Sequence, residues 1–60
     1  MPLIYKNKKN NIVVEVIKTK IFEDKVFVLV VPIEGTSISS KRLIPIIYFL
    51  ENYDRDINTR

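Results

Sequence analysis

The chain has 60 residues, and ten Lys and Arg against seven Asp and Glu give it a formal net charge of +3. It contains neither Cys nor His, which excludes disulfide bridges, catalysis by thiol or imidazole groups and the usual ligands of structural zinc. A single domain of this size buries only about 60% of the surface of its unfolded chain, so self-association is the remaining route to additional stability.

The first half of the chain predicts three strands. Pro2 to Lys6 is strand-like, and the polar segment Asn7 to Asn11 suits a turn. Ile12 to Phe22 and Lys25 to Ile33 are rich in β-branched and aromatic residues, and only two acidic residues separate them. These segments predict a β-hairpin within a three-stranded antiparallel meander.

A two-residue loop sets the register of this hairpin. The expected opposite pairs are Phe22 with Lys25, Lys20 with Phe27, Lys18 with Leu29, and Val16 with Val31. Both faces of the hairpin are then substantially apolar. The third strand lies at an edge, which suits Pro32, yet a long uncharged edge such as residues 26–31 is rarely left unpaired in water.

The last third of the chain predicts one helix, from about residue 40 to residue 55. Ser and Thr residues after Gly35 offer N-caps, and Pro45 is tolerated in the first turn. One apolar stripe, which should cover the sheet, contains Leu43, Ile46, Ile47, Leu50 and Tyr53. The predicted fold class is therefore α+β, a βββα domain spanning residues 1–60 with residues 55–60 frayed.

Two apolar runs are more than a chain of this length can wrap. Val26 to Ile33 and Leu43 to Leu50 are apolar on every side. We therefore expect a homodimer that acts as a non-enzymatic regulatory or interaction module by binding another protein. The interface candidates are Phe27, Leu29, Val31, Tyr48 and Phe49. Abundant Ile, Val, Lys and Asn without any Ala indicate an AT-rich coding sequence, as in a phage or mobile element.

Basic residues beside aromatic ones support an alternative, a small nucleic-acid-binding protein. Such interleaving is what binders of single-stranded nucleic acid use for charge and stacking. The candidate phosphate contacts are Lys18, Lys20, Lys25, Lys41 and Arg42. Lysines on a sheet also solubilise it and guard it against aggregation, so the sequence leaves the protein-binding and nucleic-acid-binding hypotheses both open.

Motifs for catalysis, cofactors or metals fail on inspection. Gly35 to Arg42 echoes a phosphate-binding loop between a strand and a helix, but Ser40 replaces its second Gly and Arg42 its metal-binding hydroxyl residue. Residues 54–58 imitate the start of a calcium loop, yet Thr59 stands where Gly is required. Neither apolar run approaches the roughly 18–20 residues of a membrane span, and no signal-peptide pattern opens the chain. We therefore expect a cytoplasmic protein without cofactor or metal.

Overall fold

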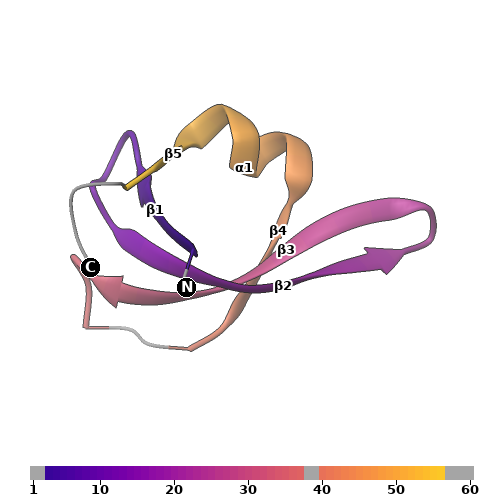
Figure 1. The fold of residues 1–60 in the computed structure, drawn as a ribbon, viewed down its shortest axis with the longest axis horizontal. Coiled ribbons are helices and arrows are strands. Elements are labelled where there is room, and N and C mark those ends of the chain that lie inside the picture. The colour runs from indigo at the N-terminus through magenta and orange to yellow at the C-terminus, as the bar shows by residue number, and fades with distance from the viewer. Residues whose placement is uncertain (1–2, 38–39, 57–60) are drawn as a thin grey trace.

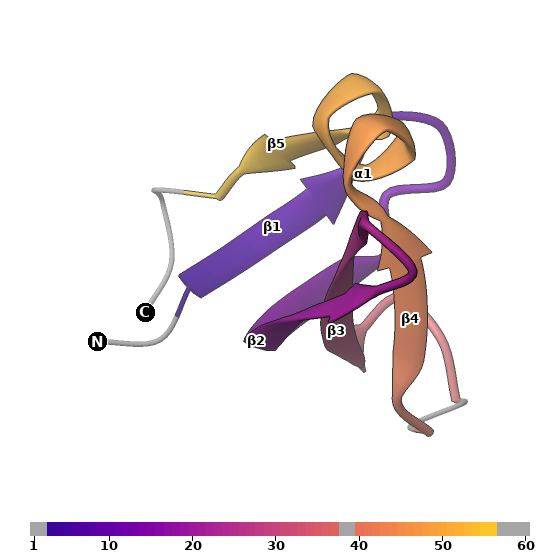
Figure 2. The same ribbon diagram turned by 90° about the vertical axis from the view of Figure 1, so that its right-hand side faces the viewer.

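The computed structural model describes residues 3–37 and 40–56, which form five strands and one short helix. The elements are β1 (Leu3–Asn7), β2 (Val13–Phe22), β3 (Lys25–Glu34), β4 (Arg42–Pro45), α1 (Ile46–Asn52) and β5 (Tyr53–Arg55). All strand pairs are antiparallel, and the strand order is β4-β3-β2-β1-β5. The sheet curls into a half-barrel, and α1 lies over its concave side (Figure 1, Figure 2).

The outer half of the β2–β3 hairpin has the predicted register. Phe22 lies opposite Lys25, Lys20 opposite Phe27, and Lys18 opposite Leu29. These three pairs follow from the two-residue loop, because loop length sets the pairing of an antiparallel hairpin.

A β-bulge changes the register of the inner half. The irregularity lies between Val16 and Lys18, and Val16 consequently pairs with Val30 rather than with the predicted Val31. One extra residue in a strand moves the following side chains to the opposite face. As a result, Val14 and Val16 share the core side with Val30, and both ends of β2 contribute apolar side chains to it.

The hairpin turn places two non-glycine residues in the left-handed region. Glu23 has a φ of 51° and Asp24 a φ of 63°. Two central residues with positive φ define a type I′ turn, whose twist matches that of the flanking strands but which favours Asn-Gly. The turn is therefore suited to the hairpin in shape and only partly in residue type.

Replacing Asp24 with Gly is expected to raise the free energy of unfolding by about 1 kcal/mol, because Gly adopts positive φ without steric cost. Urea unfolding followed by circular dichroism measures the change. Asp24→Ala is the matched control, since it also removes the charge but retains the backbone penalty, and it should not stabilise the protein. Equal midpoints for the Gly and Ala variants would contradict a strained turn.

The predicted βββα fold is wrong in its last third, where residues 42–55 form β4, α1 and β5 instead of one long helix. Pro45 is the N-cap of α1, with an extended ψ of 139°, so the helix begins only after it. The residue before a proline is also disfavoured in helical conformation, and Ile44 accordingly lies in a strand. β4 pairs with residues 27–30 of β3, which covers much of the edge that the sequence left unpaired.

β5 closes the other side of the sheet. Tyr53 leaves α1 in an extended conformation, and Arg55, which was expected to fray, pairs with Tyr5 of β1. The backbone N–H of Asp56 donates to the carbonyl oxygen of Ile4 at 2.8 Å. The predicted fraying of residues 57–60 lies outside the described residues.

The core lies between the concave side of the sheet and α1. Its buried cluster contains Val14, Val28, Val30, Ile44 and Phe49. The Phe49 ring, in a residue only 4% exposed, meets Tyr5 edge-to-face at a centroid distance of 4.8 Å and stacks on Tyr53 at 4.9 Å. One helical residue thus joins β1 and β5 to the centre of the core.

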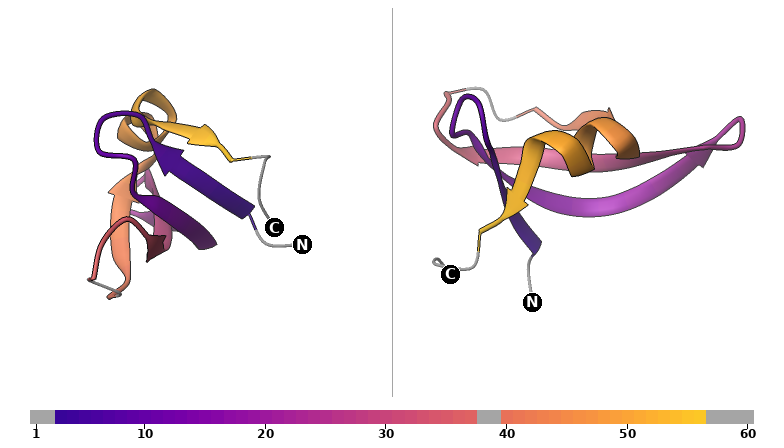
Figure 3. Two further views of the ribbon diagram at one scale, coloured as in Figure 1. Left: turned by 90° about the vertical axis from the view of Figure 1, so that its left-hand side faces the viewer. Right: turned by 90° about the horizontal axis from the view of Figure 1, so that it is seen from above.

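The helix is too short to cover the whole hairpin. Seven residues span about 10 Å at 1.5 Å per residue, whereas each ten-residue strand spans about 33 Å. The outer part of the β2–β3 hairpin consequently projects beyond α1 (Figure 1, Figure 3). We refer to residues 18–28 as the projecting hairpin.

Candidate functional site

The projecting hairpin exposes apolar side chains on both of its faces. Ile21 and Val26 lie opposite each other on the side that continues from the core, and they are 77% and 37% exposed. Phe22, on the outer side, is 61% exposed. A shallow groove of about 440 Å³ beside them is lined by Lys20, Ile21, Phe22, Phe27 and Leu43. Neither face of this segment is covered by the described part of the chain.

The three predicted lysine contacts of the hairpin share its outer face, because Lys18, Lys20 and Lys25 alternate with residues of the core side. Arg42 pairs with Val30 and therefore lies on the other, concave side of the sheet. Lys41 precedes β4 and is exposed. The five basic residues that the sequence singled out thus do not form one surface.

The predicted interface residues are also divided. Phe27, Leu29 and Val31 are half-buried along the outer face of β3. Tyr48 is half-exposed on α1, and Phe49 is buried in the core, where it offers no surface to a partner.

The sheet edge beside the projecting hairpin carries lysines. Among the described residues, β1 pairs with β2 only from Val13 to Val16, so Lys18 and Lys20 lie along an open edge. Lysines on such an edge discourage pairing with another strand. Association through the hairpin is therefore favoured at its faces and not at its edge.

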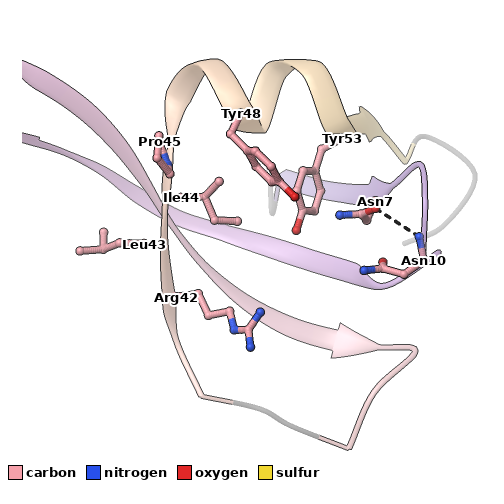
Figure 4. Close-up of a pocket in the computed structure, with 8 residues that line it drawn as sticks. All are labelled: Asn7, Asn10, Arg42, Leu43, Ile44, Pro45, Tyr48 and Tyr53. Carbon is pink, nitrogen blue, oxygen red and sulfur yellow. Dashed lines mark hydrogen bonds between the residues drawn. The ribbon is translucent and has the colours of Figure 1, made fainter.

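A second candidate site is an open groove of about 580 Å³ beside α1 (Figure 4). Its lining comes from the β1–β2 turn, from β4, and from α1 with the first residue of β5. The lining residues are Asn7, Asn10, Arg42, Leu43, Ile44, Pro45, Tyr48 and Tyr53. We call it the tyrosine groove.

Backbone hydrogen bonds hold the walls of the tyrosine groove together. The N–H of Lys8 in the β1–β2 turn donates to the carbonyl oxygen of Asn52 at the end of α1, at 2.8 Å. The Asn52 Nδ2 in turn donates to the carbonyl oxygen of Tyr48 at 2.9 Å. The turn and the helix therefore keep a fixed separation, which sets the width of the groove.

Asn7 is the buried polar side chain of this groove and is 5% exposed. Its Oδ1 accepts hydrogen bonds from the backbone N–H groups of Lys9 at 2.8 Å and Asn10 at 3.2 Å. These two donors identify the oxygen end of the amide. The Nδ2 points into the groove (Figure 4), and no described residue accepts a hydrogen bond from it.

The tyrosine groove offers hydrogen-bond donors and aromatic rings. The side chains of Tyr48 and Tyr53 extend toward each other, and the Arg42 guanidinium approaches from β4 (Figure 4). No carboxylate is among the lining residues. Sequence reasoning found Arg42 and Tyr48, for other reasons, and missed Asn7, Asn10 and Tyr53. The only signal for the two asparagines was a polar segment interpreted as a turn.

The segment after β3 does not form the anion-binding arrangement that the sequence echoed. Such a loop needs a helix directly after it, but Gly35 and Arg42 lie in a connection between two strands, β3 and β4. Residues 38–39 of that segment, and residues 58–59 of the calcium-like pattern, lie outside the described residues. Within residues 3–37 and 40–56, no three acidic side chains gather as metal ligands. In the same part of the chain, α1 is too short to cross a membrane.

Comparisons with protein-family models, with curated proteins and with solved structures gave no match to this chain. Its function is therefore argued from the two surfaces alone.

Proposed function

We propose that the protein is a non-enzymatic interaction module that assembles as a homodimer through its projecting hairpin. The observation that carries this proposal is the exposure of Ile21 and Phe22, at 77% and 61%, on opposite faces of the same two-stranded segment. Single exposed apolar residues are normal on protein surfaces, but adjacent ones on a projecting element are typical of an interaction site.

The charges of the hairpin favour a second copy as the occupant. Its tip carries Glu23 and Asp24, whereas Lys18 and Lys20 lie further along β2. When two hairpins pack antiparallel about a two-fold axis, the acidic tip of each lies against the basic part of the other. This self-complementary pattern requires no other partner chemistry, and the half-buried Phe27 and Leu29 extend the apolar surface beneath it.

The biological role that we propose for the dimer is regulatory, through binding of another protein. A symmetric dimer presents each remaining surface twice, which raises its avidity for a partner that is itself repeated. The AT-rich character of the composition supports a phage or mobile-element origin. The hairpin argument itself does not depend on this origin.

Sedimentation at micromolar concentration is expected to give twice the 7.1 kDa mass of the chain. Ile21→Lys and Phe22→Lys should each raise the dimer dissociation constant by about 100-fold or more, because each introduces a charge at an apolar contact. Both side chains are exposed in the single chain, so circular dichroism should show a retained fold.

Ile47→Lys is the matched control. Ile47 is 69% exposed on α1, so this variant adds the same charge at an equally exposed position away from the hairpin and should remain dimeric. A folded monomer of the unaltered chain at micromolar concentration, or dissociation caused equally by Ile47→Lys, would contradict the proposed hairpin dimer.

A further inference from the structure

The tyrosine groove contains a donor that the fold does not use. Asn7 is 5% exposed, its Oδ1 is engaged by two backbone N–H groups, and its Nδ2 faces the groove. Buried amide groups are nearly always hydrogen-bonded, because leaving one unpaired away from water is unfavourable. An acceptor atom from a bound molecule would complete the hydrogen bonding of this side chain.

The surroundings of the groove favour an anionic molecule. Arg42 lines it, Lys41 precedes Arg42, and Lys8 and Lys9 are exposed on the turn that carries Asn7. The nearby carboxylate of Asp54 follows Tyr53 in an extended strand, so the two side chains leave β5 on opposite faces. Asp54 is in addition paired with Lys8, Nζ to Oδ1 at 3.8 Å.

The aromatic side chains of the groove favour a ligand with flat rings. Tyr53 is held by its stacking on Phe49, at a centroid distance of 4.9 Å and an interplanar angle of 16°. Tyr48 is 50% exposed, so part of its ring is free to receive a base. The volume of about 580 Å³ lies within the range of about 300–1,000 Å³ usual for small-ligand sites. It suits a short unpaired stretch and excludes a duplex.

We propose that the tyrosine groove binds single-stranded nucleic acid. Arg42 contacts a phosphate, Tyr48 stacks with a base, and the Asn7 Nδ2 donates a hydrogen bond to an oxygen or ring nitrogen of the ligand. A positively charged groove combined with aromatic stacking is the general means by which proteins bind unpaired strands. The inference is independent of the hairpin dimer, because the tyrosine groove shares only Leu43 with the groove beside the hairpin and is complete in one chain.

Fluorescence anisotropy with short labelled single strands of thymidine or adenosine nucleotides tests this inference. Binding is expected at low salt, and the logarithm of the affinity should fall linearly with the logarithm of the salt concentration. Arg42→Ala should weaken binding about tenfold and reduce the slope by roughly 0.7, the value for one phosphate contact on a single strand. Tyr48→Ala should weaken binding by about 5- to 100-fold through lost stacking, at an exposed position where the fold is retained.

Asn7→Asp isolates the buried donor. The carboxylate can still accept from the N–H groups of Lys9 and Asn10, but it places an acceptor with negative charge where Nδ2 stood. Binding should fall more than tenfold while the circular dichroism spectrum stays unchanged. Should the spectrum change, the Arg42 and Tyr48 variants decide the outcome, because both residues are exposed.

Three controls distinguish binding in the groove from binding to the hairpin, from an effect of dimerisation and from general attraction of anions. The double variant Lys18→Ala, Lys20→Ala removes two charges from the hairpin and should weaken binding less than Arg42→Ala alone. Phe22→Lys should retain binding even where it dissociates the dimer. Labelled duplex and an acidic peptide serve as competing ligands.

Three results would overturn the inference. The first is the absence of single-strand binding at low salt. The second is equal or tighter binding of the duplex or the acidic peptide. The third is loss of binding in the hairpin double variant but not in the Arg42 and Tyr48 variants, which would place the contact on the hairpin.

Discussion

Phe49→Ala is expected to lower the free energy of unfolding by about 3–5 kcal/mol, the range for removing a buried phenyl ring from a core. Phe49 is 4% exposed and contacts Tyr5 and Tyr53, so the cavity would open between α1, β1 and β5. At about 0.05–0.15 kcal/mol per residue, a domain of this length has only roughly 3–9 kcal/mol of stability. The variant should therefore be largely unfolded at room temperature.

Urea unfolding monitored by circular dichroism measures this loss. Ile47→Ala, two positions earlier in the same helix and 69% exposed, is the matched control and should change the stability by no more than about 0.5 kcal/mol. A loss below about 1 kcal/mol for Phe49→Ala would show that the ring does not pack in the core as described.

Gly35→Ala is expected to cost about 1–3 kcal/mol. Gly35 has a φ of +88°, and an added Cβ would lie 3.0 Å from the Ile12 Cα and 3.2 Å from the Asn11 carbonyl oxygen. Both atoms belong to the backbone of the β1–β2 connection, so rotating a side chain cannot relieve the contact. Residues 11–12 and Gly35 would have to separate.

Thermal unfolding gives a direct readout of the Gly35 variant, since each 1 kcal/mol shifts the midpoint of a domain of this size by about 4–8 °C. Ser37→Ala, at an exposed position in the same connection, should leave the midpoint within a few degrees. An unchanged midpoint for Gly35→Ala would mean that the β1–β2 connection is free to move away.

The hairpin was predictable from sequence because two dense β-branched segments flank a two-residue loop. Its three outer pairs follow from that loop, whereas the bulge near Ile17 depends on how β1 and α1 share the concave side of the sheet. β4 and β5 were not predictable. Segments of four and three residues are too short for any periodicity to show, and Leu43, Ile46, Ile47 and Leu50 also match a helical stripe. Pro45 was interpreted as part of the first turn when it is the cap that delays the helix.

The tyrosine groove was less predictable than the fold, because its residues come from three separate parts of the chain. Arg42 was a candidate through its charge alone. The role of Asn7 depends on two hydrogen bonds that direct its amide nitrogen inward, and an asparagine in a polar turn carries no sequence signal of this orientation. Tyr53 faces the groove only because α1 ends after seven residues and β5 begins there.

The pairing of β5 with β1 has a further consequence for the dynamics of the chain. β5 has three residues, two of them exposed, and it joins the last described strand to the first, so local opening should detach it at a lower free energy than the β2–β3 hairpin. Tyr53 belongs both to the wall of the groove and to the stack on Phe49. Each such opening would remove one wall of the groove while leaving the hairpin intact. Occupancy of the groove and closure of β5 are therefore thermodynamically linked, and amide protons of β5 should exchange with solvent more slowly whenever a ligand is bound.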